Sequence, residues 1–109
     1  MIKVIVVDDE RFVRMGIVGE TDWASLGCEV VGEAENGLDA LELVHKKNPD
    51  LMICDIRMPK MNGLEMLKKL REEKNPVQVI FLTAYSEFSY AREALKLYAF
   101  DYLLKPFED

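Results

Sequence analysis

The feature of this sequence that most constrains its fold is a regular alternation between short apolar runs and amphipathic stretches of helical length. The first run, residues 2–7, is apolar at odd and even positions apart from Lys3, which is typical of a strand covered on both faces. Strands that alternate with helices predict a parallel sheet with helices on both faces. We expect five strands, at residues 2–7, 28–34, 51–54, 77–82 and 100–104.

Turn residues and caps set the limits of the expected helices. A short extra turn before the second strand ends at Gly27. The second helix has an apolar stripe at Leu38, Leu41 and Val44, and the charged residues of the third helix, including Arg71, are expected to face solvent. We expect helices from Arg11, from Asn36 to Asn48, over residues 64–74, and after an N-cap at Ser86.

Length and charge limit the classes of function. A chain of 109 residues favours a single domain, residues 1–109. The net charge of -6 disfavours binding to nucleic acid or to an anionic membrane, and it favours a cation or a basic partner. Cys28 and Cys54 lie in apolar runs, so we expect reduced core thiols and a cytoplasmic protein. The apolar start is too short for a signal peptide, and no run approaches membrane-spanning length.

Polar residues occur at the ends of four of the expected strands. They are Asp8 and Asp9 after the first strand, Asp55 after the third, Thr83 after the fourth and Lys105 after the fifth. Because the carboxyl ends of parallel strands lie at one edge of a sheet, we expect three carboxylates, a hydroxyl and an ammonium group to converge there.

This combination of groups suits phosphoryl transfer. Clustered carboxylates repel one another unless a cation lies between them, and Mg²⁺ is the expected cation because it prefers oxygen ligands. A carboxylate nucleophile beside a metal ion suits a reaction that needs chiefly positioning and charge neutralisation. We expect Asp55 to form an aspartyl phosphate, with Mg²⁺, Lys105 and the Thr83 hydroxyl each holding a phosphoryl oxygen.

Each of these residues also has a simpler interpretation. Asp55 can merely start a turn, and Asp8 and Asp9 can cap the first helix. Thr83 can be an ordinary loop residue, and Lys105 can be a surface charge before a proline. Their joint placement at the ends of four strands favours the functional interpretation.

Four short motifs match a known family. Together, residues 6–10, 55–59 with 62–63, 82–84 and 101–107 resemble the receiver domain of two-component response regulators. The resemblance implies a flavodoxin-like (CheY-like) α/β fold, a doubly wound five-stranded parallel sheet with strand order 2-1-3-4-5.

The resemblance also implies partners and ligands. A sensor histidine kinase would donate its phosphoryl group to Asp55, so the domain would be a phosphoacceptor signalling module and not an enzyme. Asp9, Asp55 and the backbone carbonyl of Arg57 would ligate Mg²⁺, and Asp8 would act through a water molecule.

A conformational switch is part of the same resemblance. On phosphorylation Thr83 would move toward the phosphoryl group, and Tyr102 would rotate into the space behind it. The Lys105–Pro106 bond would be cis. Tyr85, two residues beyond Thr83, would shield the phosphoryl group from water.

A closer resemblance is to regulators with an AraC-type helix-turn-helix output domain, and it rests on residues 13–17, 22–27, 31–37 and 88–91. It implies control of transcription by a DNA-binding domain beyond Asp109.

In three respects the chain departs from the family. Asn62 replaces the usual acid at a position expected to lie past the pocket, Tyr98 stands where glycine is common, and the final helix is missing. We therefore expect a truncated piece of a longer regulator, with an uncovered apolar face beside the first helix.

Two other functions remain open. A Mg²⁺-dependent phosphohydrolase also uses an aspartyl phosphate, but its nucleophile usually follows the first strand, with a second acid two residues on. Here Asp8 and Asp9 are adjacent, and Glu10 is the only acid two residues beyond Asp8. An unphosphorylated interaction domain is the other alternative, and the resemblance allows a homodimer. His45, beside two lysines, is expected to be exposed and does not support a metal enzyme.

Overall fold

Five strands form the centre of the molecule. The computed structural model describes residues 1–84, 92 and 101–105, with side chains for residues 1–82 and 92. The strands are β1 (Ile2–Val7), β2 (Cys28–Ala34), β3 (Leu51–Asp55), β4 (Gln78–Ala84) and β5 (Asp101–Lys105). They form one sheet in the order β2-β1-β3-β4-β5, and every neighbouring pair is parallel. The predicted parallel sheet and its strand order are therefore confirmed.

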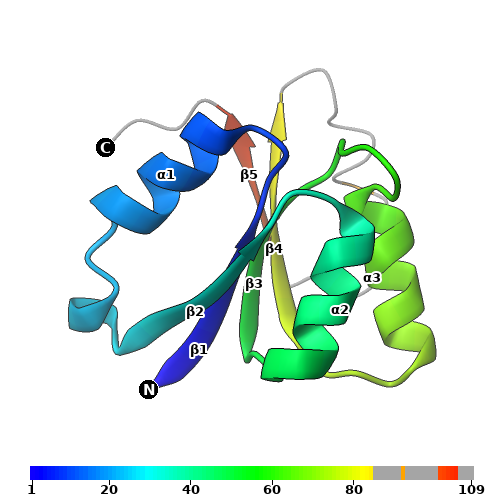
Figure 1. The fold of residues 1–109 in the computed structure, drawn as a ribbon, viewed down its shortest axis with the longest axis horizontal. Helices are drawn as coiled ribbons and strands as arrows, with labels where there is room; N and C mark the ends of the chain where they lie inside the picture. Colours follow the sequence, from blue (N-terminus) through cyan, green and yellow to red (C-terminus); the bar gives the residue numbers. More distant parts are fainter. Residues whose placement is uncertain (85–91, 93–100, 106–109) are drawn as a thin grey trace.

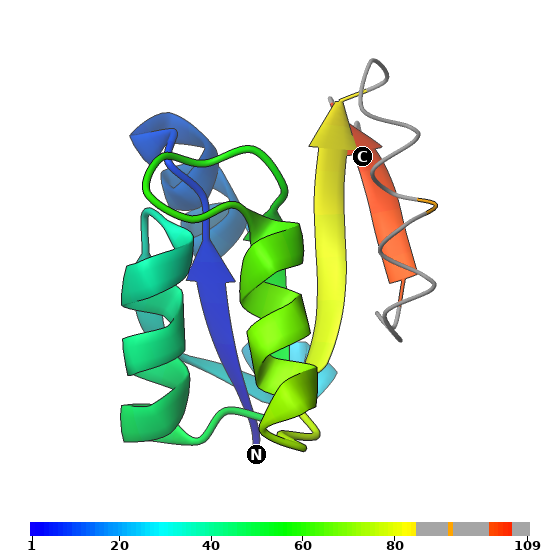
Figure 2. The same cartoon turned by 90° about the vertical axis from the view of Figure 1, so that its right-hand side faces the viewer.

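Helices cover both faces of this sheet. They are α1 (Arg11–Glu20), α2 (Gly37–Lys47) and α3 (Gly63–Glu72), with a short 3-10 turn, η1 (Ala24–Leu26), before β2. Figure 1 shows α1 and η1 on one side of the sheet and α2 and α3 on the other. Figure 2 shows α2 and α3 side by side in front of the strands, with α1 behind them. This is the doubly wound arrangement expected when strands and helices alternate.

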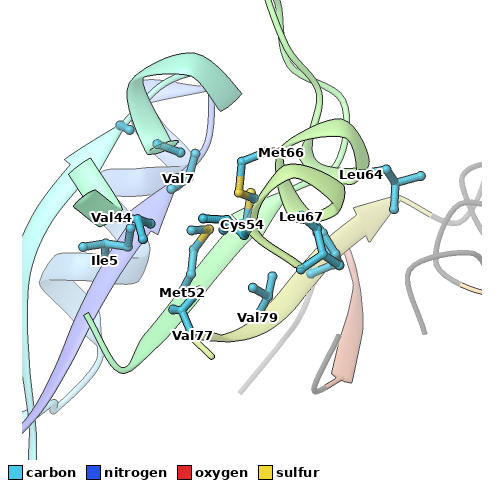
Figure 3. Packing of buried hydrophobic residues seen from close by; sticks show 14 of the residues in the cluster. Ile5, Val7, Val44, Met52, Cys54, Leu64, Met66, Leu67, Val77 and Val79 are labelled. Atoms are coloured by element: carbon cyan, nitrogen blue, oxygen red, sulfur yellow. The ribbon is translucent and has the colours of Figure 1, made fainter. Parts of the chain in front are cut away.

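Two apolar clusters hold the layers together. The larger lies between the sheet and α2 and α3 (Figure 3), and the smaller lies on the α1 side. Successive strand residues point to opposite faces, so Ile5 and Val7 join the larger cluster while Val4 and Val6 join the smaller. Both cysteines are buried and free, as predicted, one in each cluster: Cys28 in the smaller and Cys54 in the larger.

The first and last residues of the observed elements lie within two positions of those predicted from the sequence. The largest differences, of two residues, are at the end of β4, which continues to Ala84, and at the end of α3, which stops at Glu72. The helix α3 begins at Gly63, one residue early, because Asn62 caps it. The Asn62 side chain accepts a hydrogen bond from the Glu65 N–H, and the Glu65 carboxylate accepts one from the Asn62 N–H.

Two predicted helix faces need correction. Leu38 does not belong to the buried stripe of α2, because its side chain is 47% exposed, whereas Ala40 is buried there beside Val44. The start of α2 approaches the loop before α3 through Gly37, so Leu38 is turned away from the core. Arg71 is also not a solvated charge, because its guanidinium donates hydrogen bonds to two backbone carbonyls after α3.

The helix α1 carries exposed apolar side chains. None of the residues of α1 is buried, and the side chains of Phe12 and Met15 are 86% and 54% exposed.

Some predictions lie outside the described residues. They include the fourth helix from Ser86, the shielding role of Tyr85, the bulk of Tyr98 and the cis bond before Pro106. Within the described residues, no helix has the length and apolar character that crossing a membrane would require.

Candidate functional site

The sheet brings the predicted site residues to one edge. Asp8 directly follows β1 and Asp55 ends the adjacent strand β3. Thr83 lies in β4, one residue beyond the partner of Asp55, and Lys105 ends β5. The backbone positions of all four residues therefore lie at the carboxyl edge, as the sequence predicts. The side chains of Thr83 and Lys105, and that of Tyr102 in β5, lie outside the described set.

Four acidic side chains meet at this edge. Asp8, Asp9, Glu10 and Asp55 each offer a carboxylate oxygen, and these oxygens lie within 4.8 Å of one another. Asp8 and Asp55 are buried, with exposed fractions of 0% and 6%, whereas Asp9 and Glu10 are exposed. Burying carboxylates this close together is unfavourable unless positive charge compensates them. A donor set of oxygens alone suits a hard divalent cation, so this cluster could hold a metal ion.

The turn between β1 and α1 places the acids of the first strand. Asp8 Oδ1 accepts a hydrogen bond from the Glu10 N–H at 2.8 Å, and the Asp8 N–H donates to the Ala34 carbonyl at 3.1 Å. Glu10 is the N-cap residue of α1, and its side chain makes no capping hydrogen bond. Asp8 thus fixes the turn before α1 and does not cap the helix.

Asp55 is held by the loop that follows it. Its Oδ1 accepts a hydrogen bond from the Ile56 N–H at 2.9 Å, so it does take part in the turn, as the simpler interpretation requires. The loop then returns to the strand end, where the Gly63 N–H donates to the Ile56 carbonyl at 2.7 Å. Asp55 thus takes part in the turn and also belongs to the acid cluster, so its role in the turn does not exclude a functional role.

An open hollow of about 400 Å³ adjoins the cluster. It is lined by Asp9, Ile56, Arg57, Met58 and Asn62. The lining corrects the expectation that Asn62 lies past the pocket. Arg57 is exposed beside the hollow. Of the four acids, Asp9 is therefore open to a group that enters the hollow from solvent.

Sequence reasoning missed two contributors at this edge. Glu10 joins the acid cluster, although its position directly after two aspartates was a local signal for it. Arg14 donates from Nη1 to the Asp8 carbonyl at 2.6 Å and from Nε to Glu33 Oε1 at 3.3 Å. No local signal points to Arg14, because Glu33 lies on a strand that becomes its neighbour only in the folded chain.

Comparison with known proteins places this geometry in a family. The model of the "Response regulator receiver domain" family matches residues 4–109. The uncharacterized transcriptional regulatory protein YesN of Bacillus subtilis is 43% identical over 106 residues, which is 97% of this chain and 29% of YesN. The chain thus spans less than a third of that relative.

Two solved structures extend the comparison. The REC domain of AraT, a response regulator from Geobacillus stearothermophilus, has a TM-score of 0.90 and 45% identity, covering 97% of this chain and 82% of that one. CheY in the CheX-CheY-BeF3-Mg complex from Borrelia burgdorferi has a TM-score of 0.84 and 27% identity, covering 98% of this chain and 80% of that chain. The family match over nearly the whole sequence and the likeness to the solved REC domain lead to one conclusion: this chain belongs to the response regulator receiver domains.

Proposed function

We propose that this receiver domain accepts a phosphoryl group on Asp55 from a partner histidine kinase, in a Mg²⁺-dependent reaction, and thereby controls an output domain. The observation that carries the proposal is the cluster of four carboxylates, two of them buried, at the carboxyl edge of the sheet. Without a cation the members of this cluster repel one another, so their close approach favours a bound metal ion.

Asp9, Asp55 and the Arg57 carbonyl would hold Mg²⁺, with Asp8 acting through a water molecule. The oxygen donors of the cluster fit this ion. The similar CheY chain was solved in a complex that contains BeF3 and Mg, which supports the same choice here. When bound, the ion neutralises charge on the phosphoryl oxygens.

In the transfer step, a carboxylate oxygen of Asp55 attacks the phosphorus atom of a phosphohistidine. A P–O bond forms, the P–N bond breaks, and the histidine leaves with the electron pair. The protein's task is to position the attacking oxygen and to balance charge. The Ile56 N–H, which donates to Asp55 Oδ1, orients the carboxylate for this attack. Thr83 and Lys105 would contact the phosphoryl oxygens from the adjacent strand ends.

The response to phosphorylation would involve Thr83 and Tyr102. Their backbones lie on the paired strands β4 and β5, which supports coupling between them. A phosphoryl group adds negative charge and strong acceptors at Asp55, and it shifts the equilibrium only by interacting differently with the two states.

The output would be transcription. YesN is named a transcriptional regulatory protein, and this chain spans only 29% of its length. We propose, from the sequence resemblance, that an AraC-type DNA-binding domain carries out DNA recognition in a longer protein. The acidic domain described here would act in the cytoplasm without contacting nucleic acid, alone or as a homodimer.

Intact-mass analysis tests the phosphoacceptor proposal. The protein would be incubated with acetyl phosphate, with and without Mg²⁺, beside Asp55→Asn and the matched control Asp22→Asn, which removes the same charge away from the site. We expect one phosphoryl adduct on the parent and on Asp22→Asn, and none on Asp55→Asn or without Mg²⁺. An adduct that persists on Asp55→Asn would contradict the proposal, as would its absence from the parent at saturating Mg²⁺.

A further inference from the structure

Arg14 makes contacts that the proposed function does not use. This residue of α1 is mostly buried, with 15% of its side chain exposed, although it carries a charge. Its guanidinium donates from Nη1 to the Asp8 carbonyl at 2.6 Å and from Nε to Glu33 Oε1 at 3.3 Å. One side chain thus connects α1, the turn after β1 and the edge strand β2.

These contacts fix the turn that carries the acids. The Asp8 N–H already donates to the Ala34 carbonyl of β2, and the Asp8 carbonyl accepts from Arg14. Both polar groups of the Asp8 backbone are therefore bonded, one to β2 directly and one to a guanidinium that β2 orients through Glu33. Hydrogen bonds from a charged donor are about twice as strong as neutral ones, so Arg14 adds substantially to this restraint.

We infer that Arg14 is a positioning residue for the metal-binding acids, and that Glu33 orients its guanidinium. The inference rests on the proposed function, because it concerns the same Mg²⁺ site. Among the described residues, Arg14 bonds to the Asp8 carbonyl and to Glu33, and neither of these groups reacts. It holds the backbone of Asp8, and through it the carboxylates of Asp8 and Asp9, in the arrangement that a cation requires.

A purely electrostatic role and a positioning role for Arg14 predict opposite changes in Mg²⁺ affinity when the residue is removed. The guanidinium is a positive charge close to an acid cluster, so by Coulomb's law alone its removal should strengthen cation binding. If Arg14 positions the turn, its removal should weaken binding, because partners that orient metal ligands typically contribute about tenfold or more in affinity. The direction of the change therefore distinguishes the two roles.

The test is a Mg²⁺ titration followed by the amide chemical shifts of the ¹⁵N-labelled protein. Arg14→Gln would be compared with Arg11→Gln, which removes the same charge from an exposed position on the same helix. We expect Arg14→Gln to bind Mg²⁺ about tenfold more weakly than the parent, and Arg11→Gln to bind equally or more tightly. Arg14→Lys, which keeps the charge and one donor, should fall between the parent and Arg14→Gln.

Glu33 provides a second, independent pair of variants. Glu33→Gln should weaken Mg²⁺ binding more than Glu35→Gln, which removes the same charge from an exposed residue just beyond β2.

Amide hydrogen exchange reports on the turn in the absence of metal. In Arg14→Gln the Glu10 amide should exchange faster while the buried Val79 amide is unchanged, which separates local loosening from global unfolding.

The outcomes separate the two proposals. Failure of the parent to bind Mg²⁺ would overturn the proposed function and the inference together. A parent that binds, with Arg14→Gln binding as tightly as Arg11→Gln or tighter, would overturn only the positioning role. Equal loss of exchange protection at Glu10 and Val79 would likewise show a purely structural role.

Discussion

At the scale of single residues, Gly63 shows how the strand end that carries Asp55 is shaped. A Cβ atom at this position would lie 2.6 Å from the Asp55 carbonyl oxygen and 2.7 Å from Phe81 Cε1. Phe81 is fully buried, and the carbonyl belongs to the backbone of β3, so neither neighbour can move aside easily. The φ angle of Gly63 is not positive, so backbone conformation does not require glycine here. The requirement comes from the close approach of these two neighbours.

We therefore expect Gly63→Ala to lower the free energy of unfolding by about 1 to 3 kcal/mol, the usual cost of inserting a methyl group into a packed site. Gly16→Ala is the matched control, because a Cβ atom there would meet nothing within 4 Å. In the interior of α1 that change should stabilise by about 0.5 to 1 kcal/mol. Urea unfolding measures both, and equal stability of the two variants would contradict this account of Gly63.

Residues whose role follows from their place on a strand could be predicted, and residues whose role depends on a tertiary neighbour could not. The sequence places Asp8, Asp9 and Asp55 at strand ends, and the structure brings their carboxylates together. The contact of Arg14 with Glu33 spans 19 positions and exists only because β2 lies beside β1. Nothing in the local pattern distinguishes Arg14 from the solvated charges around it.

At the scale of elements, the Arg71 side chain bridges the connection between α3 and β4. Arg71 donates from Nη1 to the Asn75 carbonyl at 2.8 Å and from Nη2 to the Val77 carbonyl at 2.9 Å. Burial lowers the pKa of the guanidinium from its usual value, but arginine stays protonated at any ordinary pH. The fork of donors thus holds the helix end against the start of the strand.

Loss of this contact should destabilise the domain. We expect Arg71→Gln to lower the free energy of unfolding by about 1 to 3 kcal/mol, because two charge-assisted hydrogen bonds are lost. Lys69→Gln removes the same charge from an exposed position on the same helix. Its free energy of unfolding should stay within about 0.5 kcal/mol of the parent value. Denaturant unfolding compares them, and a loss for Arg71→Gln no larger than for Lys69→Gln would refute the bridging role.

Patterns of apolar spacing predicted the elements well and their faces less well. The strands follow from continuous apolar runs, and the cap at Asn36 follows from its residue type, since its side chain accepts from the Asp39 N–H. Leu38 was assigned to the wrong face because the spacing of leucines ignores where the neighbouring loop approaches α2. Likewise, exposed His45 lies 2.7 Å from Glu73 across the α2–α3 interface, a pairing that no spacing rule contains.

At the scale of the whole molecule, the proposed metal binding would be linked to stability. Four carboxylates within 4.8 Å of one another repel in the metal-free domain, and a ligand that binds only the folded state stabilises it. If the domain binds Mg²⁺ as proposed, a concentration tenfold above the dissociation constant would add about 1.4 kcal/mol to the free energy of unfolding.

Asp9→Asn tests the linkage, because the Asp9 side chain is exposed and carries one of the four charges. Without metal the variant should unfold at a higher temperature than the parent, since repulsion is relieved. With Mg²⁺ it should gain much less stability than the parent. Thermal unfolding at fixed ionic strength measures both effects, and the same Mg²⁺-induced shift in the two proteins would rule out Asp9 as a ligand.

The position of the acyl phosphate tests the central claim most directly. Borohydride reduces a phosphorylated aspartate to homoserine, and tryptic cleavage separates residues 48–57, which contain Asp55, from residues 4–11, which contain Asp8 and Asp9. The phosphoacceptor account predicts homoserine at position 55 and nowhere else. Homoserine in the 4–11 peptide would contradict it and favour the phosphohydrolase alternative, whose nucleophile follows the first strand.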